Sequence, residues 1–130
     1  MKTPVKEDII RIRIRRARKS LLEAQAMIEN DFTNAALNRL YYACFYSPTA
    51  LLFKKDILTK THSGVKQMLG LHYISTGVLS QEMGDFYSDI LYSRQLADYD
   101  DLEETETNLV KEYSVLAKRF VDTVQNILEL

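Results

Sequence analysis

The chain has 130 residues, of which 46% are hydrophobic and 27% charged, and its formal net charge is −1. This length suits a single domain spanning residues 1–130 and is too short for two independent ones. The near-zero net charge gives no global attraction to nucleic acid. No apolar run approaches the ~20 residues that a membrane-spanning helix needs. Cys44, the single cysteine, excludes an internal disulfide, so we expect a cytoplasmic protein.

The spacing of apolar residues predicts a first helix from about Lys6 to Glu29. Two prolines and four glycines, with no long alternating segment, favour helices throughout the chain. A short alternation over residues 10–15 is outweighed by a longer series at helical spacing. The members of that series are Ile10, Ile14, Ala17, Leu21, Ala24 and Ile28.

A second helix, ending at about Lys55, is predicted to be the centre of the fold. Its segment Asn38–Phe53 reads NRLYYACFYSPTALLF and is apolar or aromatic at every position from residue 40 to residue 46. A helix that is apolar all round is buried among other helices. We expect Asp31 or Thr33 to cap it and Pro48 to kink it.

Three further helices complete the prediction. Thr61 or Ser63 begins the third helix, which ends at Gly77 in a left-handed cap, and Ser80 caps the fourth. The fourth helix passes into an acidic loop, in which Asp101 and Glu104 resemble a capping box for the fifth helix. The inward positions of the fourth helix are Met83, Phe86, Tyr87, Ile90, Leu91 and Ala97. Those of the fifth are Leu109, Tyr113, Leu116, Phe120, Val124 and Ile127. The fold expected is all-α, an up-and-down antiparallel bundle of about five helices.

Arg94 is the most informative charge, because it falls on the apolar face of the fourth helix. Asp98 lies at i+4, within reach of the guanidinium. One interpretation is a structural Arg–Asp clamp, since a buried arginine needs a carboxylate. The other is a contact with a phosphate or nucleotide, for which the planar guanidinium is suited.

Other candidate residues are few. Arg39 enters the apolar second helix near its start and needs a counter-charge, and Tyr42 beside it needs a partner for its hydroxyl. His62 falls in the first turn of the third helix, where free backbone N–H groups favour anions, although a histidine hydrogen-bonded at a helix start is the simpler interpretation. Two separated histidines and one cysteine give no metal site and imply no cofactor.

The first helix carries a dense basic face. Residues 1–19 hold eight basic and two acidic groups, whereas the remainder holds nine basic and sixteen acidic groups. Contact with RNA, ion pairing on a solvated face and a protein partner all remain open for this face. Its basic residues are Arg11, Arg13, Arg15, Arg16, Arg18 and Lys19.

Three segments, NRLYYACFY, KTHSGV and SRQLADYDD, together resemble the HEPN (higher eukaryotes and prokaryotes nucleotide-binding) superfamily, closest to its small stand-alone prokaryotic members. The resemblance covers about Ala24 to Phe120. It implies an up-and-down helical bundle, usually a homodimer, often encoded beside a minimal nucleotidyltransferase in toxin–antitoxin or defence settings. Many members are metal-independent ribonucleases.

The chain departs from the nuclease members of that superfamily, which carry an arginine followed after four to six residues by a histidine. If the arginine is Arg94, then Tyr99, Asp100 and Asp101 occupy the histidine's place. Cleavage of RNA without metal needs a base and an acid, and histidine supplies both near neutral pH. Tyr99, with an ordinary pKa of about 10, is a poor substitute.

Three hypotheses follow. The leading one is a non-catalytic or degenerate HEPN module that binds a nucleotide, RNA or a partner nucleotidyltransferase. The binding site of this module is formed by Arg94, Asp98 and Tyr99, with Arg39, Tyr42 and His62 as neighbours. The second is an active metal-independent ribonuclease toxin that uses Arg94 with His62. The third is a structural interaction protein.

Overall fold

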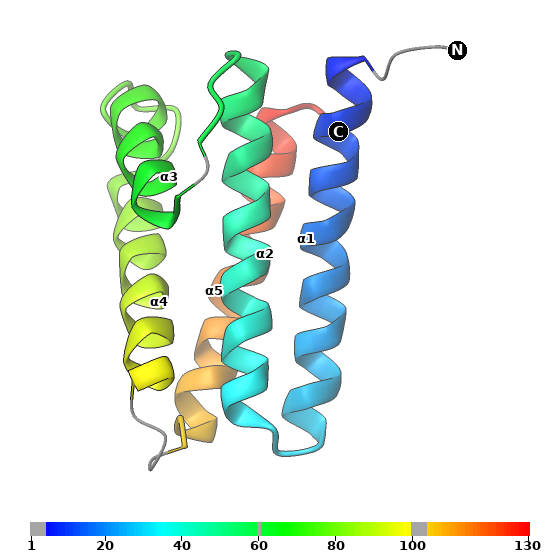
Figure 1. Ribbon diagram of the computed structural model, residues 1–130, viewed down its shortest axis with the longest axis vertical. Coiled ribbons are helices and arrows are strands. Elements are labelled where there is room, and N and C mark those ends of the chain that lie inside the picture. Colours follow the sequence, from blue (N-terminus) through cyan, green and yellow to red (C-terminus); the bar gives the residue numbers. More distant parts are fainter. Residues whose placement is uncertain (1–4, 60, 100–103) are drawn as a thin grey trace.

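The computed structural model describes residues 5–59, 61–99 and 104–130, and this part of the chain is an all-α bundle, as predicted. Its α-helices are α1 (Lys6–Glu29), α2 (Thr33–Lys54), α3 (His62–Leu69), α4 (Gln81–Tyr99) and α5 (Thr107–Ile127), and a π-helical turn, η1 (Gly70–Ile74), extends α3. Figure 1 shows α2 at the centre, with α1 on one side, α3 and α4 on the other, and α5 behind.

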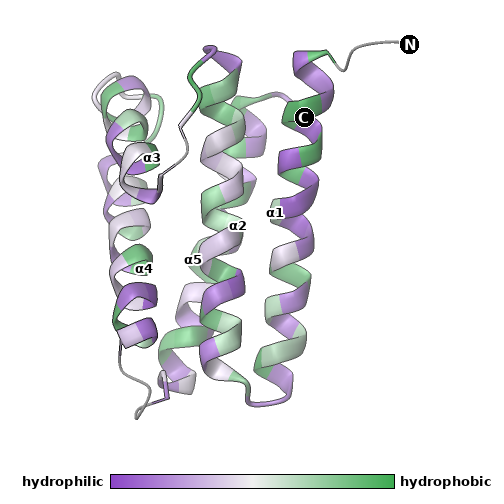
Figure 2. Cartoon of the chain, viewed as in Figure 1, coloured by the Kyte–Doolittle hydropathy of each residue, from purple (hydrophilic) through white to green (hydrophobic). Residues whose placement is uncertain are grey.

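The apolar sequence of α2 explains its central place. Helix α2 contacts each of the other four α-helices, and Leu37, Leu40, Leu51 and Leu52 along it are fully buried. Burial of each such side chain contributes about 1.5–3 kcal/mol relative to exposure. Figure 2 shows that hydropathy alternates around the outer helices. No helix in the described ranges is long and apolar enough to cross a membrane.

The start of α2 differs from the prediction. Phe32 occupies the N-cap position, and no side chain caps the helix. Asp31 takes a left-handed conformation (φ 62°) in the tight turn after α1, so its carboxylate is not positioned as a cap. Thr33 is the first helical residue, and its buried hydroxyl has no partner among the described residues. Pro48 is buried inside α2, which continues as one helix through it.

The third helix is also less regular than predicted. Thr61 caps α3, and its hydroxyl accepts a hydrogen bond from the Gly64 amide at 2.9 Å; Gly77 is left-handed (φ +79°) as expected. Between them, however, the α-helix ends at Leu69 and a π-turn follows. Tyr73 lies in this π-turn, and its buried hydroxyl donates a hydrogen bond to the carbonyl of Leu51 on α2 at 2.6 Å. This hydrogen bond ties the turn to α2.

The last two helices follow the predicted pattern. The hydroxyl of Ser80 accepts a hydrogen bond from the Met83 amide at 3.2 Å, as a cap of α4 does. The predicted inward residues of α4 and α5 are buried or half-buried. The predicted capping box stays a prediction, because Asp101 lies outside the described residues. Helix α5 has Glu106 at its N-cap position, and the side chain of Glu106 makes no capping hydrogen bond.

Candidate functional site

An aromatic cluster on α2 is the foundation of the candidate site. Tyr41 is fully buried, whereas Tyr42, Phe45 and Tyr46 are half-buried on the side of the helix that is not covered. Tyr41 contacts Tyr42 edge-on, with 5.5 Å between ring centroids, and stacks on Phe45 at 6.1 Å. Tyr42 also lies 5.8 Å from Tyr46. The cluster offers ring surfaces to ligands and supports the polar groups around it.

His62 is fixed to this cluster at the first turn of α3. Its ring lies 4.6 Å from Phe45 and 5.3 Å from Tyr41, between ring centroids. The Tyr41 hydroxyl and His62 Nδ1 are 2.5 Å apart. Burial raises the pKa of Tyr41 to about 12, so this hydroxyl stays protonated at neutral pH. It donates to Nδ1 or accepts from it, according to the tautomer of His62. Burial, and then the charge of Arg94, lower the pKa of His62, which favours a neutral ring.

The tautomer of His62 and the direction of that hydrogen bond are linked. A neutral imidazole has one donor and one acceptor nitrogen. With the Tyr41 hydroxyl as donor to Nδ1, the ring proton lies on Nε2, which then offers a donor to an anionic oxygen. With Nδ1 as donor to Tyr41, Nε2 is an acceptor.

Arg94 reaches the same cluster from α4. Its guanidinium carbon lies 5.2 Å from the ring centroid of Tyr41 and 5.4 Å from that of Tyr42. Only 19% of the side chain is exposed, and its one ion pair in the described residues is a 3.5 Å contact with Asp98, whose carboxylate is 56% exposed. Among the described residues, the buried Nε has no partner. Asp98, the ion-pair partner within those residues, does not use all five guanidinium donors, and charge-assisted hydrogen bonds to an oxyanion would suit the remaining ones.

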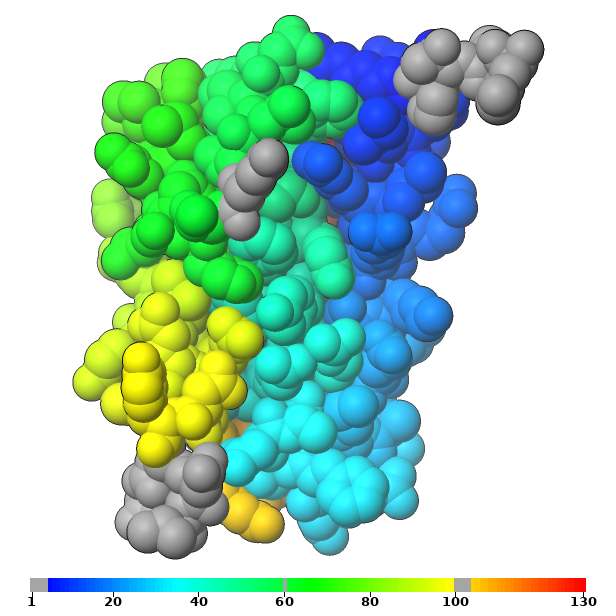
Figure 3. Space-filling model, viewed as in Figure 1, coloured from blue at the N-terminus to red at the C-terminus, as the bar shows by residue number. Residues whose placement is uncertain are grey.

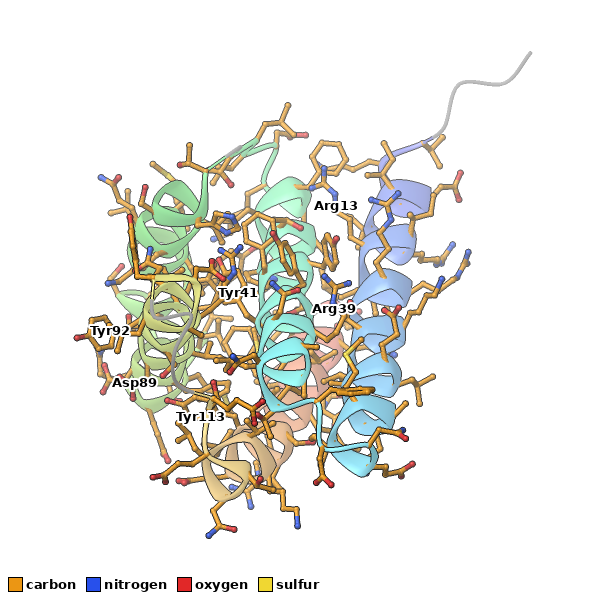
Figure 4. All side chains as sticks on the ribbon, turned by 60° about the horizontal axis from the view of Figure 1, so that its bottom comes forward. Arg13, Arg39, Tyr41, Asp89, Tyr92 and Tyr113 are labelled. Atoms are coloured by element: carbon orange, nitrogen blue, oxygen red, sulfur yellow. The ribbon has the colours of Figure 1, made fainter. Side chains whose placement is uncertain are left out.

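Arg39 adds a second guanidinium to Tyr42. Its guanidinium carbon lies 5.1 Å from the Tyr42 ring centroid, and its Nη2 donates to the Asn38 side chain at 2.8 Å. Its contact with Glu23 is long, at 3.9 Å. Figure 4 shows Tyr41 pointing from α2 toward α3 and α4, while Arg39 points toward α1. The Tyr42 ring thus lies between two cations, one from α2 itself and one from α4.

Comparison with known proteins agrees with this arrangement of helices. The sequence profile of the HEPN domain matches residues 10–130. The chain belongs to the HEPN domain family. A UPF0332 protein of Thermotoga maritima is 36% identical over 124 residues, which are 95% of this chain and 94% of that relative.

Two relatives from Methanocaldococcus jannaschii carry toxin names. "Putative toxin MJ0605" is 32% identical over 132 residues, 99% of this chain and 98% of that relative. "Putative toxin MJ0142" is 38% identical over 87 residues, 67% of this chain and 59% of that relative. The HEPN resemblance predicted from the three sequence segments is confirmed.

The HEPN fold gathers four of the six predicted site residues around Tyr41 and Tyr42. These four are Tyr42 itself, Arg39, His62 and Arg94. Asp98 lies at the edge and reaches the cluster only through Arg94. Tyr99 does not join it: its side chain is 90% exposed, and no hydrogen bond, ion pair or ring contact links it to the cluster in the described ranges.

Two residues of this candidate site, Tyr41 and Phe45, were not selected from the sequence. The signal was present, because a buried tyrosine in an apolar helix needs a hydrogen-bond partner and His62 is one of only two histidines in the chain. The pairing itself joins residues 21 positions apart on different helices, which no local pattern indicates. Among the described residues, no three His, Cys, Asp or Glu side chains lie close enough to hold a metal ion.

Proposed function

We propose that the chain is a toxin-type HEPN module that binds the phosphate groups of a nucleotide or RNA at this cluster and does not cleave them. The observation that carries the proposal is Arg94, whose guanidinium is mostly buried over two tyrosine rings and only weakly paired with Asp98. Burying a charge is costly unless it is paired. A phosphate placed against Arg94 would supply the missing acceptors in a bidentate arrangement.

We propose that the Tyr41 hydroxyl is the donor to His62 Nδ1, 2.5 Å away, so that Nε2 carries the ring proton and donates to phosphate. This tautomer supports binding rather than cleavage. A general base for the 2′-hydroxyl needs a free acceptor nitrogen at that position, and cleavage also needs an acid for the leaving oxygen. Tyr41 is a poor acid, because burial raises its pKa to about 12.

A ribonuclease is the second candidate, and the buried hydroxyl of Tyr87 favours it. In the described residues this hydroxyl makes no well-formed hydrogen bond. It nevertheless lies close enough to the Tyr41 hydroxyl to offset part of the rise that burial causes in the pKa of Tyr41, and the two rings are 6.3 Å apart between centroids. If the Tyr41 hydroxyl turned toward Tyr87, His62 could carry its proton on Nδ1 and present Nε2 as a base. Arg94 would then hold the phosphate being cleaved.

The toxin names of relatives support a paired role for the module. We propose that it acts as a homodimer beside a protein partner, with a minimal nucleotidyltransferase as the partner class. Light scattering of the purified chain tests the dimer. Co-purification with the product of a neighbouring nucleotidyltransferase gene tests the pair; a monomer that retains no such partner contradicts this part of the proposal.

Binding and cleavage can be measured on the same samples. A labelled RNA dinucleotide, titrated in the presence of EDTA, should bind the wild-type chain. Arg94→Gln should weaken binding by about ten- to a hundredfold, because charge-assisted hydrogen bonds contribute about 1.5–3 kcal/mol. Arg119→Gln, an exposed change on α5, is the matched control.

Each hypothesis predicts a different outcome. RNA that stays intact while the dinucleotide binds through Arg94 supports the module. Cleavage without metal that disappears in Arg94→Ala and His62→Ala establishes the ribonuclease. Unchanged binding by a destabilised Arg94→Gln variant would make the arginine a structural clamp.

A further inference from the structure

Helix α1 presents cations that the fold leaves unpaired. Arg11, Arg15, Arg16 and Lys19 are exposed, and none of them lies within ion-pair distance of a carboxylate in the described ranges. The basic residues that face the bundle are engaged; Arg18, for example, pairs with Asp122 at 2.6 Å. The unpaired charges therefore serve no internal contact. Figure 2 shows hydrophilic residues alternating with hydrophobic ones along α1.

Two contacts fix how α1 lies against α2. Arg13 donates to the carbonyl of Thr49 at 3.1 Å, and Glu23 lies 3.9 Å from Arg39. Residues 13 and 23 are ten apart on α1, as are 39 and 49 on α2, so the helices run antiparallel in one register between these contacts. Figure 4 shows Arg13 and Arg39 both lying between the two helices.

This register places Arg16 beside the aromatic cluster. Arg16 is three residues beyond Arg13 on α1, and Tyr46 is three residues before Thr49 on α2, so the two lie at the same level of the helix pair. Tyr46 packs in one cluster with Ala17, the residue after Arg16. Burial, followed by the charge of Arg16, lowers the pKa of Arg13, as expected if the two guanidinium groups are neighbours. Lys19 follows one turn further along α1, toward the level of Tyr42.

Cations consequently flank two tyrosine rings across one face of the molecule. From α4 to α1 the order is Arg94, Tyr42, Tyr46 and Arg16, with Arg39 beside Tyr42. Figure 3 shows this face, on which α2 forms a strip between α4 and α1. The strip spans two helix-to-helix spacings, about 16–20 Å, which exceeds what one nucleotide bound at Arg94 covers.

We infer that a segment of single-stranded RNA crosses α2 from the Arg94 cluster to Arg16 and Lys19 on α1. This inference rests on the proposed function and extends it by naming the class of ligand. Backbone phosphates contact the cations, and an unpaired base stacks on Tyr46, since the faces of the Tyr42 ring are occupied by Arg39 and Arg94. Proteins that bind single strands combine a basic track with such aromatic platforms. In a duplex the base faces are stacked on one another, so a duplex would make only the contacts between its phosphates and the basic residues.

The length of the RNA separates this inference from the proposed function. The double variant Arg16→Gln/Lys19→Gln should bind the RNA dinucleotide as the wild type does, because the dinucleotide reaches only the Arg94 cluster. It should bind a labelled single strand of about twelve nucleotides roughly tenfold more weakly. Its affinity should also vary less with salt, with the logarithmic slope falling by about 0.7 for each phosphate that the variant no longer neutralises.

Lys111→Gln/Arg119→Gln is the control, since it removes two exposed charges from α5. It should match the wild type on both RNAs. Tyr46→Leu keeps the apolar packing against Ala17 and Ala43 and should weaken binding of the longer strand alone. The inference is overturned if the α1 variant binds the longer strand as the control does, or if a twelve-base-pair duplex RNA binds as tightly as the single strand. The binding of the dinucleotide by Arg94→Gln tests the proposed function alone, so that proposal can fail or succeed independently of the longer RNA path.

Discussion

Replacing Arg94 by methionine separates a binding arginine from a structural one. Methionine is unbranched, has nearly the length of the arginine stem and can remain over the rings of Tyr41 and Tyr42. Arg94→Met removes the charge while keeping most of the apolar contact. Exchange of a buried charged group for an apolar one of similar volume is often neutral or stabilising.

The change in stability can be assembled from the contacts of Arg94. The ion pair with the half-exposed Asp98, at 3.5 Å, contributes at most about 1 kcal/mol. The two cation–π contacts contribute about 0.5–1 kcal/mol each at partly exposed sites. Against these losses stands the relief of burying Nε without a partner, about 1–3 kcal/mol. The terms nearly cancel, so we expect the free energy of unfolding to change by less than about 1 kcal/mol.

Urea denaturation and RNA titration of the same Arg94→Met sample test this balance. We expect an unchanged denaturation midpoint and a weakening of dinucleotide binding by at least about tenfold. Arg119→Met on the exposed face of α5 controls for the added methionine. A destabilisation of about 3 kcal/mol or more, with binding intact, would refute the reasoning, because it would mean that Arg94 is held for stability.

Three further predictions concern His62 and a histidine introduced at position 99. Because the pKa of His62 is lowered in the folded chain, the unfolded chain binds the proton more readily, and the free energy of unfolding should fall as pH drops through the ordinary histidine pKa of about 6.5. Urea denaturation at several pH values should show a weaker pH dependence of this free energy in His62→Gln than in the wild type. An equal pH dependence in the two proteins would contradict the lowered pKa of His62. Tyr41→Phe keeps the ring but removes the proposed donor to Nδ1, so it should cost about 0.5–1.5 kcal/mol and shift the His62 tautomer seen by nitrogen NMR; an unchanged nitrogen spectrum would show that Tyr41 does not set the tautomer. Tyr99→His restores the arginine–histidine spacing of the nuclease members. Residue 99, however, lies five residues from Arg94, about 140° around the helix, and is 90% exposed as tyrosine, so we expect no RNA cleavage without metal. Cleavage by this variant would show that the end of α4 is positioned differently when RNA binds.

The fold was predictable because helical periodicity is local. The six-residue apolar series of α1 and the unbroken apolar run of α2 are explained by the burial that they undergo. Errors arose where the backbone departs from regular geometry. The left-handed Asp31 displaced the predicted cap of α2, and the buried hydrogen bond of Tyr73 accompanies a π-turn inside the third helix.

The site was only half predictable, because its contacts join distant parts of the chain. Arg94 was found from its place on an apolar face, which is a local pattern. Its contact with Tyr42 and the hydrogen bond between Tyr41 and His62 depend on how α2, α3 and α4 pack together. Tyr99 was selected from its proximity to Arg94 along the chain, although five helical residues turn it away from that side of α4.

Spacing along a helix and distance in space are therefore separate criteria for a catalytic pair. The sequence lacks a histidine at the nuclease spacing from Arg94, yet Arg94 and His62 both contact the ring of Tyr41. What distinguishes binding from cleavage at such a site is the position of one proton. While the Tyr41 hydroxyl donates to Nδ1, His62 offers a donor to phosphate and lacks the acceptor that a base requires. In an active ribonuclease on this scaffold, the Tyr41 oxygen would accept a hydrogen bond from His62 Nδ1, and the Tyr41 proton would point toward the neighbouring hydroxyl of Tyr87.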